Sequence, residues 1–144
     1  MKIANNHLKA KGFMIAVITL SFLLAGCGET TSELIKQPGK NESWVVRAPI
    51  DVTFKTYKDY AEDNLTGGDF LWAEGLRSKA YFYGQTAELS LRLENNPFGQ
   101  GTYLHFEFSK RNDDTVVNTW YYNGRWQDNA QKFKELLPTS VGAP

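Results

Sequence analysis

Side chains suited to catalysis are few in this chain of 144 residues. It has one cysteine, Cys27, and two histidines, of which only His105 lies beyond the N-terminal apolar segment. A nucleophile needs a positioned base, and no nucleophile motif accompanies His105. Because His105 stands between Leu104 and Phe106 in an alternating run, we expect it at the surface or rim, pointing away from the face that carries those two. The sequence therefore predicts no catalytic residue and no enzyme.

Two polar stretches and three glutamates are the other candidates for ligand chemistry. Asn112-Asp113-Asp114 lacks the glycine and the distant glutamate of a calcium loop, and Gly99-Gln100-Gly101 has no basic partner for phosphate, so both are interpreted as turns. Zinc-type spacings of cysteine, histidine and carboxylate do not occur in the sequence. We expect no metal and no cofactor. Glu74, Glu88 and Glu107 belong to predicted strands, and any pairing for glycoside chemistry depends on the fold.

The single cysteine directly follows an export signal. Three lysines precede an apolar run over residues 13–24, which is short for a bilayer span. The run ends in Leu24-Ala25-Gly26-Cys27, which resembles the lipobox of bacterial lipoproteins. The alternative is an ordinary buried or disulfide-forming cysteine, but a lone thiol has no partner within the chain. Residues 1–26 are thus predicted to be a signal peptide, and Cys27 the site of lipidation.

The lipoprotein resemblance implies that the mature protein is anchored to a membrane through lipid on Cys27. The next residue is Gly28 rather than the aspartate that favours inner-membrane retention in many Gram-negative bacteria, which implies the outer membrane, facing the periplasm. The chain has 16 basic and 16 acidic residues. Three lysines and no acidic residue leave with the signal, so the mature protein is slightly acidic and offers no electrostatic surface for nucleic acid.

The mature chain divides into a tether, one domain and a tail. Residues 27–42 combine the lipidated cysteine with a stretch of mostly small and polar residues, which predicts a flexible tether. Residues 43–137 are long enough for one core and rich in large aromatic side chains, which predicts a single packed domain. Residues 138–144 are predicted to be a frayed tail.

Two helices and several strands are predicted inside this domain. A strand over 43–47 precedes Pro49, and then Ile50, Phe54, Tyr57 and Ala61 form one face of a helix that ends near Asn64, before the break at Gly67-Gly68. A last helix follows Asn123, which can cap it, with Trp126, Ala130, Phe133 and Leu137 on one face, and Pro138 stops it. Alternating runs predict strands over 70–74, 79–83, 86–93, 102–110 and 115–122, joined by turns at 95–101 and 111–114. The first two runs are either one bent strand or two.

This order predicts an α+β fold with an antiparallel sheet of four to six strands and two helices packed on one face. The succession strand, helix, strands, helix over residues 43–137 resembles the helix-grip arrangement of some envelope lipoproteins and, with additions, of lipid-transfer domains. A fold does not determine a function. The resemblance implies an architecture and leaves the activity open.

Aromatic residues supply the remaining functional hypothesis. Tyr81 and Tyr83 share one face of a predicted strand, and Trp120 and Tyr122 share another, so exposed members would mark a partner surface, whereas buried ones would be core. The first hypothesis is an envelope lipoprotein that binds another protein as an assembly, structural or regulatory accessory. The alternatives are a carrier or sensor of a small apolar ligand held between the last helix and the sheet, and an inhibitor or immunity lipoprotein.

Overall fold

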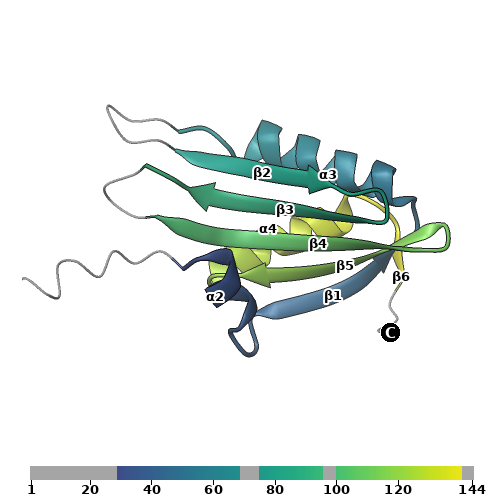
Figure 1. The fold of residues 1–144 in the computed structure, drawn as a ribbon, viewed down its shortest axis with the longest axis horizontal. Helices are drawn as coiled ribbons and strands as arrows, with labels where there is room; N and C mark the ends of the chain where they lie inside the picture. Colours follow the sequence, from purple (N-terminus) through teal and green to yellow (C-terminus); the bar gives the residue numbers. More distant parts are fainter. Residues whose placement is uncertain (1–28, 69–74, 96–99, 141–144) are drawn as a thin grey trace, which may run out of the picture.

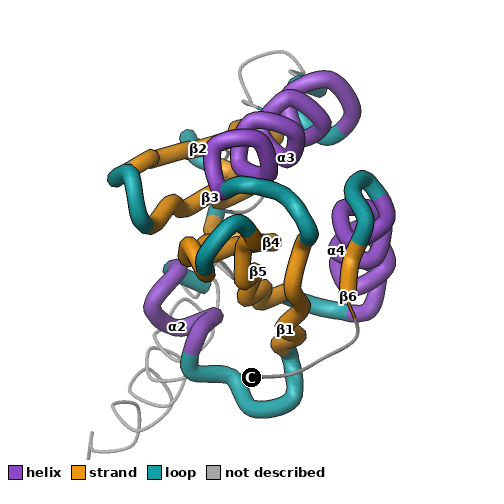
Figure 2. Tube along the Cα trace, turned by 90° about the vertical axis from the view of Figure 1, so that its right-hand side faces the viewer, coloured by secondary structure: helices purple, strands orange, loops and turns teal. Residues whose placement is uncertain are grey.

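The computed structural model describes residues 29–68, 75–95 and 100–140 and has an α+β architecture, as predicted (Figure 1). One antiparallel sheet has the strand order β2-β3-β4-β5-β1-β6. Two longer helices, α3 and α4, cover one face of this sheet, and a short helix, α2, lies on the other (Figure 2). In chain order the elements are α2 (Thr31–Ile35), β1 (Asn41–Val46), α3 (Ile50–Asn64), β2 (Leu76–Phe82), β3 (Thr86–Leu93), β4 (Gly101–Arg111), β5 (Asp114–Tyr121), α4 (Gly124–Glu135) and β6 (Thr139–Ser140).

Helix α3 matches the predicted amphipathic helix at both ends. It begins after Pro49, whose fixed φ suits a helix start. Ile50, Tyr57 and Ala61 of the predicted stripe are buried, and Phe54 is half-buried. Beyond the helix, Gly67 and Gly68 both have a positive φ, a conformation that favours glycine and ends the helical path.

Helix α4 begins where the sequence predicts it. The side chain of Asn123 accepts a hydrogen bond from the backbone N–H of Trp126, which satisfies one of the free donors at the helix start. Ala130 and Phe133 are fully buried against the sheet. The ring of Phe133 lies 4.7 Å from that of Phe106 on β4, centroid to centroid. The aromatic side chains thus join α4 to the sheet in one core.

Strands β2 to β5 form three consecutive hairpins. The predicted strand over 86–93 is β3, and its register places Leu89 opposite both Ala80 of β2 and Phe106 of β4. The tight turn between β4 and β5 has Asn112 at φ 57°, which confirms the turn interpretation of Asn112-Asp113-Asp114. The predicted strand over 70–74, which includes Glu74, lies outside the described residues.

The flexible tether predicted for residues 27–42 is wrong from residue 29 onward. Residues 31–35 form α2, whose N-terminus has a capping box in which Thr30 and Glu33 each bond the other's backbone N–H. Leu34 is fully buried, and α2 packs against β4 and β5. Strand β1 then starts at Asn41, two residues before the predicted strand. One well-placed leucine and a cap therefore order a segment whose composition is otherwise polar.

The frayed tail predicted for residues 138–144 is also wrong at its start. Thr139 and Ser140 form β6, which pairs antiparallel with Val46 and Val45. The carbonyl of Pro138 accepts a hydrogen bond from the Arg47 backbone N–H at 2.9 Å, which extends this pairing. Backbone pairing with the end of β1 and with Arg47 thus holds three residues that have few apolar side chains. Residues 141–144 lie outside the described part.

Candidate functional site

Tyr81 and Tyr83 form an exposed stacked pair at one end of the sheet. Their ring centroids are 6.4 Å apart and their planes differ by 11°. Tyr81 is 50% and Tyr83 62% exposed, which are high values for aromatic side chains. Both belong to the edge strand β2 or the turn after it, where Gly84 has a positive φ and the Tyr83 N–H bonds the Thr86 carbonyl at 2.8 Å. The hairpin thus fixes the backbone under the pair.

Phe82, between the two tyrosines, extends the exposed aromatic surface to the opposite side of the strand. It is 45% exposed, and its ring lies 5.5 Å from that of Phe54 on α3. Tyr81, Phe82 and Tyr83 are together called the aromatic edge. Of the large hydrophobic side chains that the structure describes as exposed, these three are consecutive and the fourth is Val52 on α3. Consecutive exposed aromatics are typical of partner surfaces.

Two glutamates lie beside the aromatic edge on the same face of the sheet. The register places Glu88 of β3 directly opposite both Tyr81 of β2 and Glu107 of β4. Like charges directly across two strands repel each other. Glu107 is 43% exposed, so water screens part of this repulsion. Glu88 and Glu107 thus place two carboxylates beside Tyr81, whereas Lys79, the preceding residue of β2 on this face, is paired with Glu94. A basic group of a partner would complement the two carboxylates.

Trp120, predicted for the same surface, lies elsewhere on this face. It is half-buried, and its ring is 5.7 Å from that of His105, its cross-strand neighbour on β4. Strands β3 and β4 separate β5 from β2 in the sheet. Trp120 is thus not part of the aromatic edge.

Tyr122 belongs to a third location, at the opposite end of the strands from Tyr83. Its ring packs against that of Tyr103 at 5.5 Å, and the Lys40 ammonium lies 5.6 Å from its centroid. Tyr103 in turn contacts Trp126 at the start of α4. The four residues predicted as one partner surface therefore occupy three places, and only Tyr81 and Tyr83 lie together.

His105 points away from Leu104 and Phe106, as expected, but it is buried rather than at the surface or rim. It is 2% exposed, because Ser90 and Trp120 flank it on the neighbouring strands and α2 packs on the same face. The Ser90 hydroxyl lies 2.8 Å from His105 Nδ1, and Glu107 Oε1 lies 3.6 Å from His105 Nε2. Burial lowers the pKa of His105 to about 4, although Glu88 opposes this shift. The imidazole is therefore neutral at pH 7.

Ser90, His105 and Glu107 have the residue types of a hydrolytic triad, but their surroundings do not suit acyl transfer. Ser90 is only 8% exposed, which leaves little room for a substrate carbonyl. An oxyanion hole needs free N–H donors near the nucleophile, and Ser90 and His105 are paired in the regular part of the β3–β4 ladder, before the register shift between Leu91 and Arg92. A general base also works best with a pKa near the working pH. Ser90 and His105 instead form a buried polar contact, with the partly exposed Glu107 at its margin.

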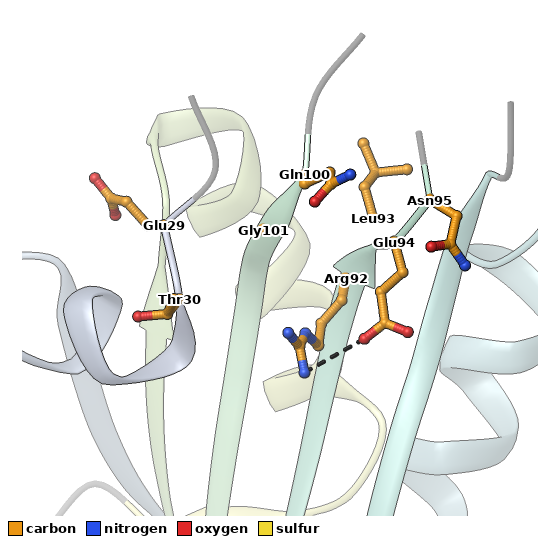
Figure 3. Close-up of a pocket in the computed structure, with 8 residues that line it drawn as sticks. All are labelled: Glu29, Thr30, Arg92, Leu93, Glu94, Asn95, Gln100 and Gly101. Carbon is orange, nitrogen blue, oxygen red and sulfur yellow. Dashed lines mark ion pairs between the residues drawn. The ribbon is translucent and has the colours of Figure 1, made fainter. Parts of the chain in front are cut away.

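A groove lies at the end of the sheet where β3 ends and β4 begins (Figure 3). Its volume is about 330 Å³. Arg92 Nη1 is 3.4 Å from Glu94 Oε1, which also lies 2.7 Å from Lys79 Nζ. The hydrogen bond from Lys79 lowers the pKa of Glu94. The lining residues are Glu29, Thr30, Arg92, Leu93, Glu94, Asn95, Gln100 and Gly101.

The groove has mixed charge and no dominant ligand chemistry. The side chains of Glu29 and Thr30 point away from Arg92 in Figure 3. Within the described ranges, Arg92 Nε and Glu29 Oε2 are buried without a hydrogen-bond partner. The same ranges contain no group of three or more histidine, cysteine and carboxylate side chains that could hold a metal ion. Because Arg92 lies beside Glu94 and the lining also contains Glu29, neither an anion nor a cation is clearly favoured.

Comparison with known proteins does not assign this chain to a family. The sequence matches no protein-family model, and no curated protein matches it significantly. None of the helices placed by the structure is long and apolar enough to cross a bilayer. Cys27 and the rest of the lipobox precede the first described residue, so lipidation remains a prediction from the sequence. The aromatic edge is the candidate functional site.

Proposed function

We propose that this chain is an envelope lipoprotein, anchored by lipid on Cys27, whose folded domain binds another protein through the aromatic edge. The observation that carries the proposal is the stacked pair of Tyr81 and Tyr83, which are 50% and 62% exposed on a fixed hairpin. Large aromatic side chains are enriched in the energetic centres of interfaces. A pair held in one geometry also loses little conformational entropy on binding. The protein acts as an assembly, structural or regulatory accessory and not as an enzyme.

The edge position of β2 supports the same proposal. The Gly67 N–H bonds the Leu76 carbonyl, so the backbone of Leu76 faces away from β3. In an antiparallel pair this direction alternates, so the backbone groups of Ser78, Ala80 and Phe82 also face outward. A partner strand can pair with such an edge while its side chains contact the tyrosines. The neighbouring Glu88 favours a partner with basic residues at the contact.

The finer fold assignment also belongs to this proposal. The order β1, α3, β2 to β5 and α4 supports a helix-grip-like arrangement, in which the last helix lies along the sheet. In a carrier of a small apolar ligand, a cleft would separate that helix from the sheet. Here Phe133 fills this space and is fully buried, with Phe106 4.7 Å and Tyr57 5.3 Å away. This packing favours a protein-binding accessory over a carrier.

The membrane anchor can be tested through the thiol that would accept the lipid. Cys27→Ser removes this thiol, so the variant should remain unprocessed or soluble and should take up no palmitate analogue during growth. The parent chain should be labelled and should fractionate with the outer membrane, as Gly28 implies. Equal labelling of the variant and the parent would refute lipidation at Cys27, and fractionation with the inner membrane would refute the location.

The binding surface can be tested with matched truncations of exposed side chains. Tyr81→Ala and Tyr83→Ala should each weaken the same partner by at least about 2 kcal/mol, as interface anchors do. Val52→Ala is the control, because Val52 is 45% exposed on α3 and outside the aromatic edge. Each variant is checked by circular dichroism, and its co-purified envelope proteins are compared with those of the parent.

The partner itself is located by crosslinking. A photocrosslinking amino acid at position 83 should capture the protein that Tyr83→Ala loses, whereas the same amino acid at position 52 should not. Retention of every partner by both folded tyrosine variants would refute the aromatic edge as the binding surface. Loss of the partner in Val52→Ala as well would show that binding does not depend on this edge specifically.

A further inference from the structure

We infer that the lipid on Cys27 holds the domain directly against the bilayer in one orientation, with the start of β4 facing the lipid and the aromatic edge directed away from it. This inference rests on the proposed lipidation of Cys27. It adds a membrane-facing surface of the domain, which contacts the headgroup layer of the membrane that holds the lipid. This orientation depends on how short the chain is between the lipid and the fold, and on where that chain joins the sheet.

The fold begins almost immediately after the proposed anchor. The Glu29 carbonyl accepts a hydrogen bond from the backbone N–H of Thr102 on β4 at 2.8 Å. The hydroxyls of Thr31 and Thr102 lie 2.9 Å apart, and Leu34 is fully buried. These contacts attach the chain to the sheet from Glu29 onward. Only Gly28 separates Glu29 from the anchor.

This short connection limits how far the domain can move from the lipid. Consecutive Cα atoms are 3.8 Å apart, so the Cα atoms of Cys27 and Glu29 are separated by at most about 7 Å. A flexible segment over residues 28–42 would instead span roughly 20 Å. Because the lipidated cysteine lies at the membrane surface, the end of the sheet near Glu29 must lie there too. With so short a link, contact between the domain and the headgroups limits how far the domain can tilt.

The antiparallel sheet then defines which surfaces are near to and far from the bilayer. β4 starts beside Glu29 and runs for 11 residues. At about 3.4 Å per residue, the ten steps from Gly101 to Arg111, at its far end, span about 34 Å. The turn at Asp113 follows β4 and the hairpin that carries Tyr83 leads into β3, and both lie at this far end (Figure 1). The aromatic edge is therefore presented to partners outside the headgroup layer.

Electrostatics alone would not orient the domain in this way. The near end carries Arg92 and Lys40 but also Glu29 and Glu94, and the groove between them has mixed charge. A protein attracted mainly by anionic lipid would present a basic surface instead. The orientation thus follows from the attachment of Glu29 to β4, and it should not depend on the lipid charge.

The test measures the distance of two labelled positions from the headgroups in the full lipidated protein. Cys27 is the only native cysteine and its thiol carries the lipid, so a single added cysteine can be labelled selectively. Gln100→Cys places a fluorophore at the near end, and Asp113→Cys places one at the far end; both positions are exposed. Each protein is reconstituted into phosphatidylcholine vesicles that contain a lipid with a spin-label quencher on its headgroup.

We expect the label at position 100 to be quenched several-fold more than the label at position 113, in neutral vesicles and in vesicles with added phosphatidylglycerol. Ten glycine and serine residues inserted between Gly28 and Glu29 provide the matched control. This insert spans about 17 Å and should remove most of the difference. Equal quenching at both positions with the native link, or stronger quenching at position 113, would overturn the orientation.

Mass spectrometry of the same preparations separates this inference from the proposal on which it rests. If Cys27 carries lipid but the two labels are quenched equally, the orientation is wrong and the anchor stands. If Cys27 carries no lipid and the protein does not bind vesicles, both are wrong. Unequal quenching that disappears with the insert supports both.

Discussion

Phe133 is the side chain whose truncation should cost the most stability, because it joins α4 to both α3 and the sheet. Its side chain is fully buried, and its ring lies 4.7 Å from Phe106, 4.9 Å from Tyr60 and 5.3 Å from Tyr57. Phe133→Ala removes these contacts and leaves a cavity between rigid aromatic neighbours that can collapse only in part. We expect a loss of about 4 kcal/mol in the free energy of unfolding.

Phe54→Ala is the matched comparison. The helical stripes place Phe54 and Phe133 in equivalent positions, which predicts a loss of about 3 to 5 kcal/mol for each. The structure distinguishes them, since Phe54 is half-buried and contacts the exposed Phe82 as well as the buried Phe108. Water can enter the space left by Phe54, so we expect about 2 kcal/mol there.

Urea unfolding of a soluble chain that starts at Glu29 measures both losses. The fragment must include α2, since a start at Asn41 would delete the buried Leu34. A shift of the midpoint with an unchanged m-value would report stability alone. A loss below about 1 kcal/mol for Phe133→Ala, or a larger loss for Phe54→Ala than for Phe133→Ala, would refute the described core.

Three further predictions concern features that the structure adds. Leu34→Ala should lower the free energy of unfolding by about 2 to 3 kcal/mol. Amide hydrogen exchange should become faster in residues 29–40 than in the sheet, and an equal increase in both would contradict this. His105 has a pKa of about 4 in the folded protein and 6.5 in the unfolded chain. The unfolded state therefore binds more protons between these two pH values. About 3 kcal/mol of the free energy of unfolding, fully present above pH 6.5, should be lost as the pH falls to 4. Urea titrations over this range should show that His105→Gln lacks this component, and an unchanged slope would refute the assignment. Glu88→Gln should raise the free energy of unfolding, measured by urea, by up to about 0.5 kcal/mol at low salt and by less at high salt, because it removes the repulsion from Glu107. A lower free energy of unfolding would show that this repulsion is negligible.

Most regular elements could be predicted from sequence because their side chains alternate or repeat clearly. Ala87, Leu89 and Leu91 all face the core along β3, and the stripe of α3 repeats over a full 15 residues. Helix α2 has five residues and one buried leucine, so its apolar pattern cannot repeat at the helical period. The signal that could have revealed it is the capping box of Thr30 and Glu33, three residues apart.

The candidate site could be predicted only in part, because it depends on which strands are neighbours and what covers them. Alternation places Tyr81 and Tyr83 on one face of a strand, and the structure finds them stacked and exposed. The same pattern at Trp120 gives a different result, because that strand lies three positions away in the sheet. The contact between Ser90 and His105 also follows from strand register, which neither residue reveals locally.

The short strand β6 makes the two edges of the sheet chemically unequal. On one side, Thr139 and Ser140 pair antiparallel with Val46 and Val45 at the end of β1. On the other side, β2 has no such cover beyond the bridge from Gly67 to Leu76 in the described residues. A foreign strand therefore meets backbone groups that are already paired at the C-terminal end of β1, whereas in the described residues β2 pairs with β3 on one side only, apart from the bridge at Leu76. Thr139 and Ser140 thus direct edge-to-edge association to β2 and so discourage open-ended polymers, which need two free edges in every copy.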